Sequence, residues 1–258
     1  GDMSATTAIM LAAGVGSRLG AESAGRPKAL LRVGPKTLLQ RHFEILWRCG
    51  IRDVVLGVGY QAEHIAAEAA ATAGPMRVRV VHNPDYRSGS VVTLATLAKE
   101  LPVGEPVLLM DADVLYDDRM IERLQGSPHD NCFLLDRGAE DGEEPVKICV
   151  RGNRIVEFRK KVDVAYDYWG ESVGFFRFSA PVATWLARIA GEYVASGRMR
   201  EPYEDAIREM VLSQSPHTFG FEDVTGLPWV EVDFPEDVDR ARSEILPRLV
   251  EGRADTSD

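Results

Sequence analysis

The sequence predicts an α/β fold: a doubly wound, Rossmann-like, mostly parallel sheet with an antiparallel β extension in its second half. Short apolar runs typical of buried strands alternate four times with segments of helical period over the first 111 residues. Such alternation implies right-handed crossovers and parallel strands. After residue 136, three strand-like segments follow one another without helices, which favours antiparallel pairing. Ligand sites are therefore expected beyond the carboxyl ends of the parallel strands.

The expected elements follow from local patterns. A helix begins after Thr37, a suitable N-cap, shows apolar residues three or four positions apart, and stops at Gly50. By the same reasoning we expect strands at residues 8–12, 54–58, 77–82, 107–111, 146–150, 154–158, 172–178 and 229–232. We expect helices at residues 38–49, 62–71, 90–101, 181–195, 203–213 and 235–250.

These elements are expected to form one domain over residues 3–250. No internal repeat is visible, and no linker is long or polar enough to separate independent units. Residues 251–258 are interpreted as a flexible tail, and Gly1 and Asp2 ahead of Met3 as an expression remnant.

The composition is that of a globular protein with small-molecule or protein partners. The chain of 258 residues is 45% hydrophobic, and its formal net charge of -10 argues against nucleic acid or a membrane surface as a partner. Its three cysteines are widely spaced and its five histidines lack metal-site spacing, so neither a disulfide framework nor a zinc site is indicated. The sequence shows no signal peptide or membrane span, and we expect a cytoplasmic protein.

A glycine-rich loop after the first strand is the strongest functional signal. It contains Gly14, Gly16 and Arg18, and Lys28 follows in an Arg-Pro-Lys run. Glycines let backbone N–H groups approach phosphate oxygens, and the cations add fixed positive charge. Residues 18–36 hold five bases and one acid, 5 - 1 = +4, against the sign of the whole chain. The pattern matches neither a P-loop nor a dinucleotide fingerprint, which would need a glycine where Leu19 stands.

Residues 11–28 resemble the signature of the nucleotidyltransferases that activate sugar, polyol or amino-alcohol phosphates, a family with a GT-A-like fold. The resemblance implies that the loop wraps a nucleoside triphosphate, that Arg18 and Lys28 act catalytically on its phosphates, and that pyrophosphate leaves. Residues 3–136 are then the nucleotide-binding half and residues 137–250 the acceptor-binding half. The nucleotide-binding residues of the loop are Leu11, Ala12, Ala13, Gly14, Val15, Gly16, Ser17, Arg18 and Lys28.

Aspartates at strand ends are the predicted magnesium ligands. Nucleotidyl transfer needs a hard cation, and Mg²⁺ takes one or two carboxylates beside phosphate oxygens and water. Asp111 and Asp113 follow the strand at 107–111, where alternation directs both to one side. The resemblance implies Asp113 as one ligand and Asp233, ahead of a Pro-Glu-Asp helix start, as the second. Asp111 is expected beside the nucleotide.

Two further loops are expected to hold the base of the nucleotide. The resemblance places them after the second strand and before the helix at 90–101, and their polar groups suit a pyrimidine edge. The second loop lacks the Gly-Thr-Ala form common among the sugar-nucleotide members, which weakens the case for thymidine or uridine. Ser90 is also a suitable helix N-cap. The residues are Gly59, Tyr60, Asn83, Ser88, Gly89 and Ser90.

The second half resembles the branch that makes CDP-choline and CMP-aminoethylphosphonate. Lys147 and Lys160 are expected to act on the phosphate or phosphonate of the acceptor. Aromatic rings mixed with carboxylates suit an ammonium head group, although aromatics beside apolar strands are usually core, as we expect for Trp185 and Trp229. The acceptor-binding residues are Tyr168, Trp169, Glu171, Tyr203 and Glu204.

These patterns together predict a Mg²⁺-dependent cytidylyltransferase. An acceptor oxygen that is already anionic attacks the α-phosphorus of CTP in line and releases pyrophosphate, so no general base is required. Three alternatives stay open: a sugar-1-phosphate or polyol-phosphate nucleotidyltransferase, a non-catalytic nucleotide-sensing subunit, and a hydride-transferring dinucleotide enzyme. The acceptor, the base preference and the oligomeric state are also open, and a homodimer is consistent with the sequence.

Overall fold

The computed structural model describes residues 5–139, 142, 144–213 and 219–249. The remnant and the tail expected at the two ends of the chain lie outside the described residues. Within them, no helix is long and apolar enough to cross a bilayer. Cys49, Cys132 and Cys149 are free thiols, so the fold is held together without disulfides among them.

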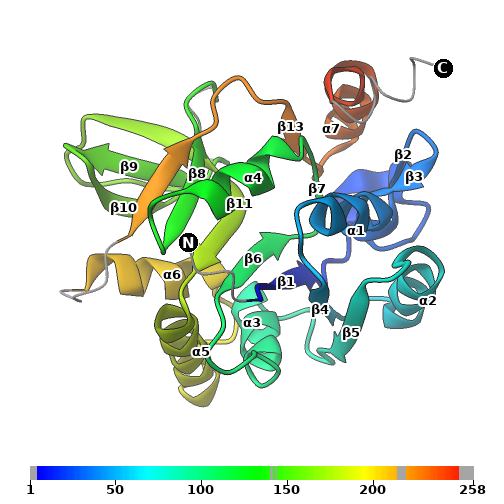
Figure 1. Ribbon diagram of the computed structural model, residues 1–258, viewed down its shortest axis with the longest axis horizontal. Coiled ribbons are helices and arrows are strands. Elements are labelled where there is room, and N and C mark those ends of the chain that lie inside the picture. The colour runs from blue at the N-terminus through cyan, green and yellow to red at the C-terminus, as the bar shows by residue number, and fades with distance from the viewer. Residues whose placement is uncertain (1–4, 140–141, 143, 214–218, 250–258) are drawn as a thin grey trace.

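A nine-stranded sheet forms the centre of the described chain (Figure 1). Four of its strands are parallel neighbours in the order β6-β1-β4-β5. In these registers Leu11 lies beside Asp111 and Ala12 beside Val58, so the carboxyl ends of the strands meet at one edge. The parallel strands are β1 (Thr7–Ala12), β4 (Asp53–Val58), β5 (Arg77–His82) and β6 (Val107–Asp111).

The second half of the chain extends this sheet with antiparallel strands. The long strand β11 pairs antiparallel with β6, β8 and β9, and β10 continues the sheet beyond β9. The predicted fold class, a mostly parallel sheet with an antiparallel extension, is confirmed. The added strands are β8 (Cys132–Asp136), β9 (Lys147–Arg151), β10 (Arg154–Arg159), β11 (Tyr168–Phe178) and β12 (Gly220–Asp223), the last of which pairs parallel with β8.

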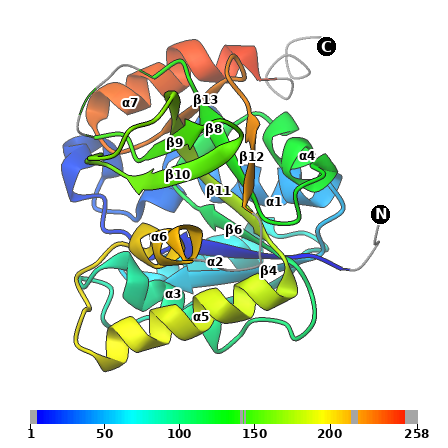
Figure 2. The same cartoon turned by 90° about the vertical axis from the view of Figure 1, so that its left-hand side faces the viewer.

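Helices cover both faces of the sheet (Figure 2). Alternate residues of β1 enter different cores, since Ala8 and Met10 belong to one buried cluster and Ile9 to the other. The first cluster includes residues of α1 (Leu38–Arg48), α2 (Ala62–Thr72) and α4 (Arg119–Gly126). The second includes residues of α3 (Ser90–Ala98), α5 (Ala180–Ala195) and α6 (Tyr203–Leu212).

Helix α1 forms for the reasons visible in its sequence. The Oγ1 of Thr37 accepts a hydrogen bond from the backbone N–H of Gln40 at 3.1 Å, which caps the helix. Its apolar residues Leu39, Phe43 and Leu46 are buried on one face, each contributing about 1.5–3 kcal/mol relative to exposure. Gly50 follows with a φ of 87°, a left-handed conformation that ends the helix at low steric cost.

Several elements differ from the prediction. Several short elements were missed: α4, β8, β12 and β7 (Val114–Tyr116), and the local hairpin of β2 (Arg32–Val33) with β3 (Lys36–Thr37). The helix predicted at 235–250 is helical from Pro235 to Arg248 but changes type, because α7 (Pro235–Arg240) continues as a π-helical segment at Ala241–Ile245 and a 3-10 turn at Leu246–Arg248. Pro247 lacks the backbone N–H that a continuous helix needs.

The two-stranded ribbon of β7 and β13 (Trp229–Glu231) matters most for the site. The strands pair antiparallel, with Glu231 opposite Val114 and Trp229 opposite Tyr116. The ribbon therefore brings a segment from the end of the chain against the residues that follow β6. It stands at the carboxyl edge of the parallel strands (Figure 1).

Candidate functional site

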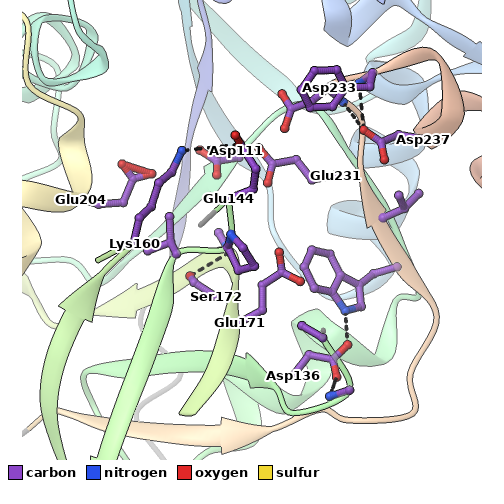
Figure 3. A pocket seen from close by; sticks show the side chains of 18 of the residues that line it. Asp111, Asp136, Glu144, Lys160, Glu171, Ser172, Glu204, Glu231, Asp233 and Asp237 are labelled. Carbon is purple, nitrogen blue, oxygen red and sulfur yellow. Dashed lines mark hydrogen bonds and ion pairs between the residues drawn. The ribbon is translucent and has the colours of Figure 1, made fainter. Parts of the chain in front are cut away.

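A cleft of about 1290 Å³ opens at the carboxyl ends of the parallel strands. Its wall combines residues from both halves of the chain, among them Arg18, Asp111, Lys160, Glu204 and Asp233. Figure 3 shows Asp111, Glu231 and Asp233 on one side, with Glu171 and Asp136 farther along the wall. This edge is where ligand sites of open α/β sheets lie.

The β7–β13 ribbon brings three carboxylates together. The carbonyl oxygen of Asp113 accepts a hydrogen bond from the N–H of Val232 at 2.9 Å, which holds the two strand ends side by side. One carboxylate oxygen each of Asp113, Glu231 and Asp233 lies within 4.8 Å of the others. The predicted ligands Asp113 and Asp233 are thus neighbours, and their role as ligands stays a prediction. Glu231 was missed, although strand alternation two residues before Asp233 signals it.

The two loop cations lie against this carboxylate set. The Nζ of Lys28 lies 3.1 Å from Oδ2 of Asp113 and also hydrogen bonds to Oδ1 of Asp233. Arg18 pairs with the same Asp233 oxygen at 3.3 Å and stacks over the ring of Phe234 at 4.7 Å. Arg18 and Lys28 therefore share one site with acids that lie 85 and 205 residues beyond Lys28 in the chain.

The shape of the loop explains this placement. Gly16 has a φ of 71°, and residues Ser17–Ser23 then form a 3-10 helical segment. A Cβ on Gly16 would lie 3.0 Å from Cγ of Lys28, so another residue would push the lysine stem aside and would also strain the backbone at this φ. Leu19 is fully buried and packs in one cluster with Val230 and Val232, which flank Glu231. The loop is thus anchored on the strand that carries the acids.

The carboxylates are buried and repel one another. Burial, followed by the charge of neighbouring acids, raises the pKa of Asp111 and Glu231 well above their ordinary values. Burial also raises the pKa of Asp113, although Lys28 opposes it. Burial disfavours a charged Lys28, but Asp113 and Asp233 outweigh it and raise its pKa. An all-oxygen donor set with this excess of negative charge fits a hard divalent cation such as Mg²⁺.

The predicted base-binding residues divide between two places. Only Ser90 of this group lines the main cleft. Ser88 and Gly89 line a second hollow of about 580 Å³, and the side chain of Asn83 is buried and bonded to Thr93 and to the N–H of Asp85. The hydroxyl of Tyr60 donates to the carbonyl of Gly25 at 2.8 Å, which ties the turn after β4, with Gly59, to the glycine-rich loop.

The helix-cap interpretation of Ser90 is wrong. Gly89 is the N-cap of α3, and Ser90 is the first helical residue, without a capping side-chain bond. Its Oγ instead accepts a hydrogen bond from the N–H of Tyr203 at 2.9 Å, while the N–H of Gly89 donates to the carbonyl of Met199 at 2.7 Å. The expected base loop and the start of α6 are therefore joined directly.

The predicted acceptor residues also divide. Lys160, Glu171, Tyr203 and Glu204 line the cleft. Lys147, Tyr168 and Trp169 are not among its lining residues in the described chain, and Lys147 is 7% exposed. Its Nζ donates to the carbonyls of Gly142 and Lys160 and lies 5.2 Å from the ring centre of Trp169. Carbonyl partners and burial suit a lysine that supports the wall rather than one that meets a ligand.

Asp136 of the cleft wall was missed by sequence reasoning. Trp229 belongs to a buried core cluster, as expected, and also lines the cleft, where it donates its Nε1–H to Oδ2 of Asp136 at 2.7 Å. Glu171 stands on the same wall, where burial and the charge of Asp136 raise its pKa to about 7. Burial likewise raises the pKa of Glu204 to about 7.

Comparison with known proteins identifies the class that this fold and site define. Residues 8–160 match the family model of the MobA-like NTP transferase domain, and the chain belongs to this family. The matched residues include the glycine-rich loop, Lys28 and the aspartates after β6.

Individual relatives are similar over most of this chain. It is 32% identical over 242 residues to the bifunctional IPC transferase and DIPP synthase of Rubrobacter xylanophilus, with 93% of this chain and 52% of that protein covered. It is 26% identical over 253 residues to the CMP-5'-(3-aminopropyl)phosphonate synthase of Streptomyces rubellomurinus, covering 93% of this chain and 39% of that one. The chain thus spans about half, or less, of the length of these relatives.

Solved structures share the fold over more than nine-tenths of the chain. The inositol-1-phosphate CTP transferase from T. maritima superposes with a TM-score of 0.73 at 20% identity, covering 93% of this chain and 97% of that one. The CTP:phosphocholine cytidylyltransferase from Streptococcus pneumoniae gives 0.71 at 20% identity, covering 92% and 98%. At this identity the likeness establishes the nucleotidyltransferase fold.

Proposed function

We propose that this chain is a cytidylyltransferase that transfers CMP from CTP to a small phosphate or phosphonate acceptor and releases pyrophosphate. One observation carries the proposal: Arg18 and Lys28 from the glycine-rich loop meet Asp113, Glu231 and Asp233 at the carboxyl edge of the sheet. Polyphosphate chemistry needs such facing sets, because the cations neutralise phosphate oxygens and the acids hold a metal ion. The names of the similar proteins, which include CTP transferases and a CMP-phosphonate synthase, support the same reaction.

Each part of the site has a role in this reaction. Arg18 and Lys28 bind the β- and γ-phosphates and stabilise the leaving pyrophosphate. Asp113, Glu231 and Asp233 are the residues that would hold Mg²⁺, which when bound neutralises charge on the transferring phosphoryl group. The acceptor oxygen is already an anion, so the protein need only align it and exclude water.

The acceptor end of the cleft favours an amino-alcohol head group. Lys160, 55% exposed at its side chain, is available to the acceptor's phosphate or phosphonate, and its Nζ lies 4.0 Å from a carboxylate oxygen of Glu144. Glu171 and Glu204 are carboxylates that an ammonium group stabilises in their charged form. Trp229 adds an aromatic face on the same wall. Phosphocholine and 2-aminoethylphosphonate both combine an anion with an ammonium group.

A polyol phosphate is the second candidate acceptor. The similarity to an IPC transferase at 32% identity favours it, and the carboxylates of the cleft also accept hydrogen bonds from hydroxyl groups. With either acceptor, the two halves of the proposed single domain bind different substrates. Nucleotide contacts come from residues 3–136 and acceptor contacts from residues 137–250. A cytoplasmic location and a homodimer stay predictions.

The test is pyrophosphate release from the purified chain. CTP, UTP, dTTP and GTP are each paired with phosphocholine, 2-aminoethylphosphonate, inositol 1-phosphate and glucose 1-phosphate. We expect release with CTP and an amino-alcohol acceptor, and a loss of at least about 10³-fold in Asp113→Ala. Turnover with a sugar 1-phosphate alone would reject the acceptor assignment. Nucleotide binding without turnover would support a sensing subunit, and equal rates for Asp113→Ala and the wild type would refute the metal assignment.

A further inference from the structure

A buried polar pair lies beneath the carboxylate set and takes no part in the roles above. His42 of α1 is completely buried. Its Nε2 lies 2.9 Å from the carbonyl oxygen of Ala112, and its Nδ1 lies 2.9 Å from the hydroxyl of Tyr116. Ala112 separates Asp111 from Asp113 in the sequence, so the imidazole holds the backbone of the segment that carries both acids.

The chemistry of the partners sets the direction of both bonds. A carbonyl oxygen only accepts hydrogen bonds, so Nε2 must carry the proton. Nδ1 of the neutral ring is then an acceptor, and the Tyr116 hydroxyl donates to it. Burial lowers the pKa of His42 to about 4, with the bond to Ala112 opposing it, so the ring is neutral near pH 7. The two hydrogen bonds therefore run in one direction: the Tyr116 hydroxyl donates to His42, and His42 donates to the carbonyl of Ala112.

The contacts of this pair reach every strand that positions an acid. Ala112 also donates its N–H to the carbonyl of Leu11 at 3.1 Å, at the end of β1. Tyr116 lies on β7 opposite Trp229 of β13, two residues before Glu231. Phe175 of β11 packs edge-on against the Tyr116 ring at 4.6 Å. The imidazole thus links α1 to the backbone of Ala112 and to the ribbon that brings Glu231 to Asp113.

Packing alone does not account for a histidine at this position. The neighbouring buried residues of α1, Leu39, Phe43 and Leu46, are apolar, and an apolar side chain would fill the volume without desolvating two ring nitrogens. A histidine is favoured where both nitrogens find partners that must be held in place. Here one partner is the carbonyl between two acids of the cleft.

We propose that His42 is a positioning residue of the cation site: its Nε2–H fixes the Ala112 carbonyl and thereby the direction of the Asp113 side chain, while Nδ1 fixes the ribbon that carries Glu231. The inference rests on the proposed function in one respect, that these acids hold a divalent cation. Groups that orient metal ligands without touching the metal typically change metal affinity by about 10- to 100-fold when replaced.

The experiment measures Mn²⁺ binding directly, by electron paramagnetic resonance, with and without CTP. His42→Leu removes both hydrogen bonds at similar volume and is expected to weaken Mn²⁺ binding by about tenfold or more. His42→Gln keeps a donor that reaches the Ala112 carbonyl and is expected to restore binding to within about threefold of wild type. Tyr116→Phe removes only the hydroxyl and is expected to give a smaller loss, about threefold.

Phe43→Leu is the matched control, because it damages the same buried helix next to His42 and keeps the imidazole that bonds to Ala112 and Tyr116. We expect it to lower the melting temperature and leave Mn²⁺ binding unchanged. The inference is overturned if His42→Leu leaves Mn²⁺ affinity unchanged, or if Phe43→Leu weakens it equally. Should His42→Leu fail to fold, Tyr116→Phe decides, and wild-type Mn²⁺ affinity in that variant overturns the inference.

Failure of the proposed function gives a different pattern. If no nucleotide and acceptor pair turns over, yet the wild type binds Mn²⁺ and the His42 variants weaken that binding in the stated order, the positioning role stands and the reaction is wrong. If the wild type binds no Mn²⁺ with or without CTP, the positioning role is overturned as well.

Discussion

Replacing Lys28 by methionine separates two effects of its positive charge: competition with a divalent cation for the carboxylates, and binding of the nucleotide phosphates. Lys28 carries a positive charge whose Nζ contacts Asp113 and Asp233, two of the acids proposed to hold Mg²⁺. Methionine keeps the length of the side chain and removes that charge. We expect Lys28→Met to bind a divalent cation more tightly in the absence of nucleotide, because no ammonium competes for the same oxygens. We expect the same variant to lose activity.

The magnitude follows from the geometry. At 3.1 Å, an ion pair in surroundings with an effective dielectric constant of about 20 has an interaction energy of about 5 kcal/mol. The two side chains are 15% and 21% exposed, so water screens the pair only in part. We take about a third of that energy as the cost that the Lys28 charge adds to binding of a divalent cation. Removing the charge then raises the affinity for the cation about tenfold, since about 1.4 kcal/mol is one factor of ten. Loss of the phosphate contact lowers kcat/KM by about 10²–10³.

The assay is Mn²⁺ titration of the free protein, followed by pyrophosphate release at saturating Mg²⁺. Lys99→Met is the matched control, because Lys99 is exposed at the end of α3 opposite to Ser90. It should leave both measurements unchanged. If the Mn²⁺ affinity of Lys28→Met equals the wild-type affinity or is lower, Lys28 does not compete with the metal ion for the carboxylates. Unchanged activity would refute the phosphate role of Lys28.

Two further predictions test the walls of the cleft. Gly174 has a φ of 85°, and a Cβ there would lie 2.3 Å from Oδ2 of Asp111, so Gly174→Ala should lower kcat/KM at least about tenfold. Gly152→Ala, at a φ of 61° with open space around it, has a similar backbone cost of about 1–2 kcal/mol and should lower only the melting temperature; equal activities of the two variants would refute the role of Gly174. Because the pKa of Glu171 is raised from 4.5 to about 7, its contribution to stability is present below pH 4.5 and lost as the pH rises through 7. Thermal unfolding should therefore show Glu171→Gln stabilised relative to wild type at pH 8.5 and not at pH 4.5, and a pH-independent difference would contradict this.

Much of the fold was predictable because its signals are local. The alternation of strands and helices through β6 follows from apolar periodicity. Helix α1 follows from its Thr37 N-cap, its apolar residues three or four positions apart, and Gly50 at its end. The missed elements β7, β8 and β12 are three to five residues long. Such segments are stabilised by pairing with distant strands, and periodicity over so few residues cannot separate a strand from a turn.

The candidate site was predictable to the extent that its chemistry lies in short motifs. The loop from Leu11 to Lys28 was selected from residue type and spacing, the resemblance carried by that loop implied Asp113 and Asp233, and the structure brings Lys28 and both acids together. Lys147 shows the limit of this reasoning. It was assigned to the acceptor from its residue type and sequence context, and the structure buries it against two backbone carbonyls.

The sequence by itself determined the family, the glycine-rich loop and the order of the main strands, because each depends on residues close together in the chain. Only the tertiary structure decided that Glu231 completes the carboxylate set, that Lys28 contacts two of its members, and that His42 holds the backbone between Asp111 and Asp113. These contacts join segments about 70 to 205 residues apart. The pairing of β7 with β13 and the packing of α1 against them determine such contacts, and neither is encoded in a local pattern.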